Sequence, residues 1–221
     1  MELSTNINSF IADINRADKA VKRATVTALN WTAFDAREDL QDEMRRVFDN
    51  PTPWTINSVF VKKATQRTYQ ATVGIKNTSL SGAPAAEYLR THVEGGDRTV
   101  KRFERLLRKS GVLKGNQRVV AAGAARKNKY GNITKARLSR IIKDVRNGRK
   151  AGATYFTMRK GNAPIGIFQR KNSKTLVAEF GIVNGTMHYR DVLNMSGVVL
   201  STRDRKFKGA YQRALRRELS N

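Results

Sequence analysis

Histidines and carboxylates are the residues from which a metal or acid–base site would have to be built. The chain has two histidines, His92 and His188, which lie far apart in the sequence, and it has no cysteine. A zinc site would need both histidines together with carboxylates, and neither histidine stands in a spacing typical of metal ligands. Glu179 and Asp191 with a neighbouring lysine could serve a nuclease, but such triples arise by chance in most chains.

Motifs for nucleotide binding and for nucleophilic catalysis are also missing from the sequence. No Gly-x-x-x-x-Gly-Lys-Ser/Thr phosphate loop occurs, and Gly161 and Gly166 bracket a segment that is typical of a hairpin turn. No Gly-x-Ser-x-Gly nucleophile elbow occurs either. We therefore predict that the protein is not an enzyme and that it needs no metal and no cofactor.

Positive charge is the dominant feature of the composition. The 221 residues include 43 Lys and Arg against 18 Asp and Glu, a net charge of +25. Residues 1–50 carry a net charge of −2 and residues 51–221 a net charge of +27. Such a field favours a partner that is nucleic acid, an acidic membrane surface or an acidic protein face, and charge alone does not choose among them.

Two predicted helices, 97–109 and 134–146, carry the densest basic residues. The expected contact surface consists of Arg98, Lys101, Arg102, Arg105, Arg108, Lys135, Arg137, Arg140, Lys143 and Arg146. These side chains could face phosphates, and Tyr130 and Tyr155 could stack on bases. No zinc finger, RNP motif or KH-type loop accompanies them. For Tyr155 and Phe156 we favour a place in the core of a sheet.

The first fifty residues have the apolar period of a helix, which Asn50-Pro51-Thr52-Pro53 must end. A straight helix of this length would span roughly 65 Å at 1.5 Å per residue. A globule of this size has a diameter of roughly 45 Å. The helix is therefore expected either to break near Asn30 or to extend past its own domain. In the second case its apolar stripe needs a neighbour.

An acidic stripe follows on the second half of this helix. Its members recur at helical spacing and are Asp35, Glu38, Asp39, Asp42 and Glu43. We favour a solvated face partnered by nearby arginines, with a docking strip for the basic part of an adjacent subunit as the alternative. A carboxylate metal site ranks third, because no histidine or ordered loop accompanies the stripe. We interpret Trp54, at the end of the Pro51–Trp54 bend, as a packed anchor, with a role in a subunit interface as the alternative.

The remaining pattern predicts an α+β fold with an antiparallel sheet. Strands are expected at 56–63, 68–76, 154–159, 165–170 and 175–182, with a turn at 64–67. Helices are expected at 85–93, 97–109 (capped by Asp97) and 134–146 (capped by Thr134), and at the basic C-terminus. We thus predict a long helix over 1–50 and one α+β domain over 51–221 with a basic insertion at about 112–150, of which 112–132 is expected as loop.

The ends and the hydropathy of the chain bear on its compartment. No run of about 18 apolar residues occurs, so no membrane span is expected. The polar N-terminus lacks the basic head and apolar run of a signal peptide. The absence of cysteine excludes disulfides and fits the cytosol.

Three groups of residues form a pattern that extends over most of the chain. The first comprises Ala28-Leu29-Asn30-Trp31-Thr32-Ala33 with Arg37, residues 43–49 and Pro51-Thr52-Pro53-Trp54-Thr55. The second comprises 83–89 with Gly95-Gly96-Asp97-Arg98 and 101–104, and the third comprises 166–170, His188-Tyr189-Arg190 and the basic helix that ends at 214–219. Together they resemble structural proteins of tailed bacteriophages, of the minor tail protein Z or tail completion type.

This resemblance implies a virion component at the neck or tail: a head–tail connector, tail completion or minor tail protein, made in the host cytoplasm. It implies a ring of several copies around the DNA path and no catalytic residue. The implied partners are copies of itself, other neck, portal or tail proteins, and passing or packaged DNA contacted non-specifically, with no membrane. Ring neighbours meet through two different surfaces, as an acidic helix and a basic body would. The alternative is a stand-alone, sequence-independent nucleic-acid-binding protein.

Overall fold

The N-terminal helix α1 is unbroken from Ile7 to Val47. The computed structural model describes residues 7–80, 82–148, 152–161 and 163–220. At Asn30, where a break was one expectation, the helix continues, and the side chain accepts a hydrogen bond from Ala64 N (2.7 Å) and donates one to Ala64 O (3.2 Å). The helix ends before Asn50, which has a positive φ of 46°. A short helix, α2 (Pro53–Ile56), follows, and its N-cap Thr52 accepts a hydrogen bond from Thr55 N.

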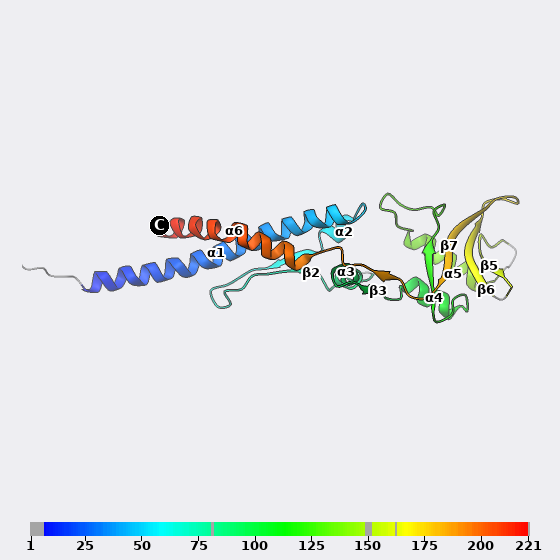
Figure 1. Ribbon diagram of the computed structural model, residues 1–221, viewed down its shortest axis with the longest axis horizontal. Helices are drawn as coiled ribbons and strands as arrows, with labels where there is room; N and C mark the ends of the chain where they lie inside the picture. The colour runs from blue at the N-terminus through cyan, green and yellow to red at the C-terminus, as the bar shows by residue number, and fades with distance from the viewer. Residues whose placement is uncertain (1–6, 81, 149–151, 162, 221) are drawn as a thin grey trace, which may run out of the picture. The chain divides into compact units, whose positions relative to one another are not determined.

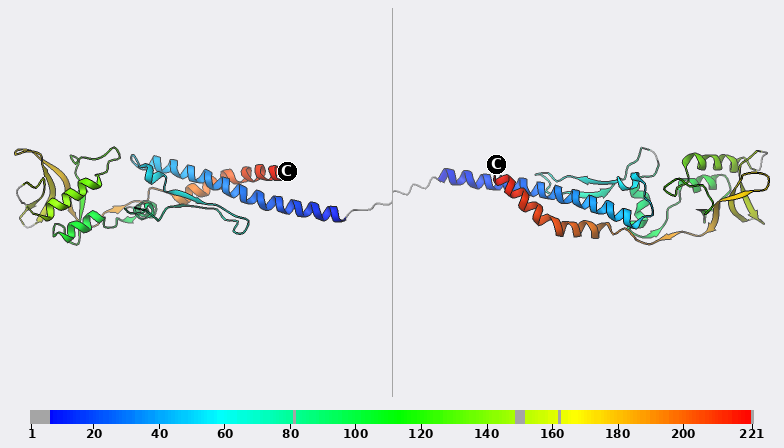
Figure 2. Two further views of the ribbon diagram at one scale, coloured as in Figure 1. Left: turned by 180° about the vertical axis from the view of Figure 1, so that it is seen from behind. Right: turned by 90° about the horizontal axis from the view of Figure 1, so that it is seen from above.

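The C-terminal helix α6 (Met195–Leu219) packs along α1 in the opposite direction (Figures 1 and 2). Polar contacts fix this orientation, because Asp39 bonds to the start of α6 whereas Arg23 lies 3.8 Å from Glu218 at its end. Small side chains such as Ala24 and Ala210 are buried, so the two backbones can approach closely. The N-terminal part of α1, before about residue 20, has no buried residue.

The helix pair belongs to a discontinuous unit, Met1–Val93 with Val192–Asn221. It also contains α3 (Ala85–Val93) and the antiparallel pair β1 (Val59–Lys62) and β2 (Thr72–Ile75). The connection between these strands is longer than the turn expected at 64–67. The core consists of Leu40, Met44, Ile56, Val59, Ala85, Leu89 and Leu193.

The second unit, Glu94–Asp191, is built on a four-stranded antiparallel sheet in the order β4-β7-β6-β5. The strands are β4 (Gln117–Ala121), β5 (Tyr155–Lys160), β6 (Ala163–Arg170) and β7 (Leu176–Asn184). Helices α4 (Arg102–Lys109) and α5 (Lys135–Arg146) pack on its inner face. A short pair, β3 (Gly96–Asp97) with β8 (His188–Tyr189), closes the unit. The core contains Leu107, Val112, Leu113, Val119, Ile141, Ile142, Tyr155, Ile167 and Phe180.

A β-bulge in β7 decides which way one carboxylate points. Ile167 pairs with Phe180 and Phe168 pairs with Ala178, so Glu179 is the extra residue on β7. A bulge changes the direction of side chains on its strand. Here Glu179 and Phe180 are both buried, Phe180 in the core and Glu179 against α5.

The α+β class and both long terminal helices are confirmed. The division of the chain differs from the expected boundary at residue 50, because α1 pairs with α6 and completes a unit with it. Within the expected loop 112–132 lies the strand β4. Asp97 was expected to cap a helix but lies in β3, and α4 begins at Arg102. Thr134 does cap α5, accepting from Arg137 N.

Among the helices that the structure describes, none combines the length and the apolar character needed to cross a membrane.

Candidate interaction surfaces

Glu104 is the centre of a buried polar cluster in the second unit. Its side chain is 0% exposed and accepts hydrogen bonds from Arg98 Nη2 (2.6 Å) and Nη1 (3.2 Å). Its oxygens also accept from the backbone N–H groups of Lys101 (2.9 Å) and Val119 (3.0 Å). The carboxylate therefore ties the start of α4 to β4 and to the segment after β3.

Burial alone would raise the pKa of the Glu104 carboxyl, but its hydrogen bonds outweigh burial. The Arg98 guanidinium and the N–H groups of Val119 and Lys101 all favour the charged form, so the pKa of Glu104 is lowered. Arg98 is itself 9% exposed. It is therefore committed to Glu104 and does not belong to the predicted basic contact surface.

Glu179 forms a second buried pair with Arg137 of α5. Arg137 Nε donates to Glu179 Oε2 (3.0 Å), Nη2 donates to Oε1, and Nη2 also donates to Gln169 Oε1 (2.9 Å). The Arg137 guanidinium also lies over the Tyr155 ring, 5.5 Å from its centroid. The hydrogen bond to Glu179 raises the pKa of Arg137. Arg137 therefore holds α5 on the sheet, which removes it from the expected contact surface.

The residues considered for catalysis or metal binding lie in different environments. Glu179 is engaged by Arg137, whereas Asp191 is exposed. His92 is half-buried, its pKa is lowered by burial, and its ring packs edge-on against Phe48 at 5.2 Å. His188 Nδ1 lies 3.3 Å from Asp97 on the surface. Within the described ranges, no group of three His, Asp or Glu could hold a metal ion.

The acidic stripe of α1 is engaged largely within its own unit. Asp39 accepts from the Thr202 hydroxyl (2.6 Å) and from Arg205 Nη2 (2.7 Å), both on α6. Asp42 pairs with Arg45 and Glu43 with Arg46 one turn along the helix. Asp35 is half-buried and Glu38 is exposed. The favoured interpretation, a solvated face partnered by arginines, thus describes Asp42. Asp39 instead stabilises the helix pair. A docking role for the stripe stays a prediction.

Trp54 is not a packed anchor, because 55% of it is exposed on α2. The short helix α2 buries Ile56 instead of Trp54. An exposed tryptophan is available to a partner, so the alternative of an interface residue stays a prediction.

Most of the expected basic contact residues do lie on the surface. The exposed ones are Lys101, Arg102, Arg105, Lys135, Arg140, Lys143 and Arg146. Arg108 is half-buried and donates to Gln117 O (3.0 Å). The whole second unit has 24 Lys and Arg against 6 Asp and Glu, a net charge of +18, and two of those six acids are the buried Glu104 and Glu179. Tyr155, considered for base stacking, is buried in the core as favoured, whereas Phe156, also expected in the core, is half-buried on the opposite face of β5, because neighbouring residues of a strand point to opposite faces.

Exposed apolar side chains of the described residues recur at the start of α1 and on the outer face of the four-stranded sheet. At the start of α1, Ile7, Phe10, Ile11 and Ile14 are 67, 64, 50 and 52% exposed at helical spacing. On the outer face of the sheet, Val120 and Leu176 are about two-fifths exposed at 40 and 43%. The exposed side chains of α1 follow the periodicity of the sequence. The apolar outer face of the sheet could not be found from the sequence, because the bulge in β7 interrupts the alternation of apolar and polar residues along that strand.

Comparison with known proteins gave no match: no family model fits the sequence, and no curated protein or solved structure is significantly similar to it.

Proposed function

We propose that the protein is a structural subunit of a tailed-bacteriophage virion, acting at the neck or tail as one of several copies around the DNA path. The sequence pattern described above suggests this role. In this role the first unit, which contains α1 and α6, docks on neighbouring subunits. The basic second unit lies toward DNA or toward acidic protein faces.

The observation that carries the proposal is the exposed apolar stripe at the start of α1, formed by Ile7, Phe10, Ile11 and Ile14. All four side chains are at least half exposed, and α6 ends near Arg23, so it does not cover them. Full burial of one such side chain stabilises by roughly 1.5–3 kcal/mol, so the four supply at most about 6–12 kcal/mol to an assembly. A surface of this kind is typical of a protein–protein interaction site.

The test is the location of the protein in intact particles. We expect mass spectrometry of purified particles to detect it and antibody–gold labelling to place it at the head–tail junction. Label at the distal tip would make it a tail-tip subunit instead. Particles that contain none of the protein would refute the virion role.

Two matched variants connect that location with α1. Ile14→Asp places a charge in the stripe and is expected to remove the protein from particles while its circular dichroism is unchanged. Lys19→Asp, on the same exposed segment but about 140° away around the helix, should still be incorporated. Equal incorporation of both variants would show that the stripe is not the docking surface.

A second candidate function is sequence-independent nucleic-acid binding, favoured by the +18 charge of the second unit. Exposed cations of α4 and α5, such as Arg102 and Arg140, would contact phosphates. Binding would then weaken steeply with salt, because each phosphate contact adds to the log–log slope. Salt-independent binding of a short DNA duplex, or none at 50 mM salt, would contradict it.

A further inference from the structure

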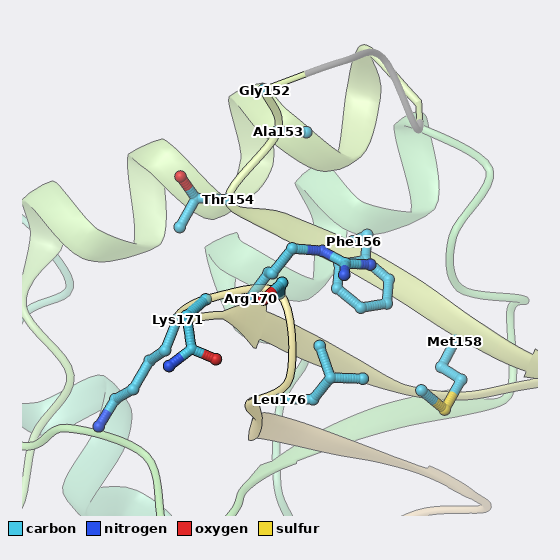
Figure 3. Close-up of a pocket in the computed structure, with 10 residues that line it drawn as sticks. Gly152, Ala153, Thr154, Phe156, Met158, Arg170, Lys171 and Leu176 are labelled. Carbon is cyan, nitrogen blue, oxygen red and sulfur yellow. The ribbon is translucent and has the colours of Figure 1, made fainter.

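The outer face of the sheet carries a short stack of flat groups. Phe156 on β5 pairs in register with Phe168 on β6, and their rings stack with centroids 6.5 Å apart. Arg170, two residues beyond Phe168 on the same face, places its guanidinium 5.4 Å from the centroid of the Phe156 ring. Figure 3 shows Arg170 lying across Phe156, with Met158 and Leu176 beside them. The Arg170 guanidinium is thus held over an aromatic ring.

A cavity of about 690 Å³ opens beside this stack. Its lining combines apolar groups, Phe156, Met158 and Leu176, with the cations Arg170 and Lys171. None of the described residues that line it is acidic. Ligand sites commonly measure about 300–1,000 Å³ and combine apolar walls with a few polar groups. This cavity has the size and character to accept a planar group that carries negative charge.

The rim of the cavity is held in place by the turn between β6 and β7. Asn172 Oδ1 accepts hydrogen bonds from Lys174 N (3.0 Å) and Thr175 N (2.7 Å). The turn therefore has a fixed backbone, and it carries two exposed cations, Lys171, which lines the cavity, and Lys174. An anion that follows a planar group into the cavity would meet these ammonium groups.

Single-stranded nucleic acid has both of the required features. Its unpaired bases stack on aromatic side chains and on arginine planes, and its phosphates meet lysines. Bases within a duplex are already stacked and cannot enter such a cavity. An acidic protein segment would use the lysines, but it would leave the planar face of Arg170 without a matching group.

We propose that the outer sheet face around Phe156 and Arg170 binds unpaired bases of single-stranded nucleic acid. One base stacks on the Arg170 guanidinium, and the adjacent phosphates contact Lys171 and Lys174. This inference deepens the second candidate function and rests on the second unit binding nucleic acid, but it assigns a different face from that of α4 and α5.

The test measures binding of fluorescein-labelled dT12, and of a 12-base-pair duplex, to the full chain by anisotropy over a range of salt. Arg170→Lys keeps the charge but removes the planar guanidinium. Phe156→Leu keeps apolar volume but removes the ring. Each is expected to weaken dT12 binding about 5- to 150-fold, the effect of losing one stacked base. The salt slope of Arg170→Lys should stay that of the wild type, because no charge is lost.

Arg126→Lys, in the loop between β4 and α5, is the matched control, because it makes the same exchange at an exposed arginine outside the cavity and outside α4 and α5. It should bind dT12 as the wild type does, and unchanged circular dichroism would show that all variants fold. If Arg170→Lys weakened binding of the duplex and of dT12 equally, or weakened neither, the sheet-face site would be overturned. Nucleic-acid binding by the second unit would still stand. No binding of either probe would overturn both proposals. Binding of a polyglutamate peptide in place of dT12 would assign the face to an acidic protein.

Discussion

Replacing Glu104 by glutamine should destabilise the second unit more than any exposed substitution in it. The carboxylate is fully buried and accepts from Arg98 and from two backbone N–H groups. Removing one partner of a buried ion pair costs about 3–5 kcal/mol, because the other charge stays buried without compensation. Glutamine keeps one acceptor oxygen, so we expect Glu104→Gln to lose about 3 kcal/mol and Glu104→Ala to lose about 5 kcal/mol.

Hydrogen exchange measured by mass spectrometry suits this test, because both tryptophans, Trp31 and Trp54, belong to the first unit and their fluorescence does not report on the second. A loss of 3 kcal/mol accelerates exchange of globally protected amides in β4 and α4 by roughly 150-fold. Peptides from α1 and α6 provide an internal reference. Glu94→Gln changes an exposed carboxylate of the same unit and should cost less than about 0.5 kcal/mol. If Glu104→Gln exchanged as slowly as Glu94→Gln, the reasoning from the buried cluster would be refuted.

Three further predictions concern other parts of the chain. The pKa of Glu104 is lowered in the fold from its usual value near 4.5. The stabilisation by this carboxylate is therefore complete above that value and is lost as the pH falls through the folded pKa. Protection of the β4 amides from hydrogen exchange, measured over a series of acid pH values, should show this loss, and the loss should be smaller in Glu104→Gln. Asn30→Ala removes both hydrogen bonds to Ala64 and should cost about 1–3 kcal/mol in urea unfolding followed by tryptophan fluorescence, whereas an unchanged midpoint would contradict their role. Leu40→Ala should cost about 2–5 kcal/mol in the same assay, because Leu40 is 0% exposed in the core of the first unit, and a loss below 1 kcal/mol would count against that packing.

The elements that the sequence predicts well are those with long, regular periods. The helix that contains Leu40 repeats its apolar residues over many turns, and Ala85–Val93 is a helix with the expected bounds. The strand β4 was hidden, because Gln117-Arg118-Val119-Val120-Ala121 has its apolar residues in succession, without the alternation of a half-buried strand, and stands among glycines and lysines. It becomes a strand because β7 pairs with it and because Glu104 binds the N–H of Val119.

The parts that could not be predicted depend on contacts between residues far apart in the chain. Nothing local in Asp39 indicates that it bonds to Thr202, and the predicted stripe treated it as a surface carboxylate. Arg98 and Arg137 look like any other arginine of a basic segment until the fold supplies a buried glutamate for each. The outer sheet face has the same origin, since its members come from three strands whose register is set by a bulge.

The discontinuity of the first unit has a consequence for the nascent chain. The alanine face of α1 cannot meet α6 until the ribosome has passed through all of Glu94–Asp191. At about 5–20 residues per second, that delay is roughly 5–20 s. The second unit is continuous in sequence and can fold during this interval. We therefore expect the basic unit to be folded first, while α1 emerges as an unpaired amphipathic helix that chaperones can bind.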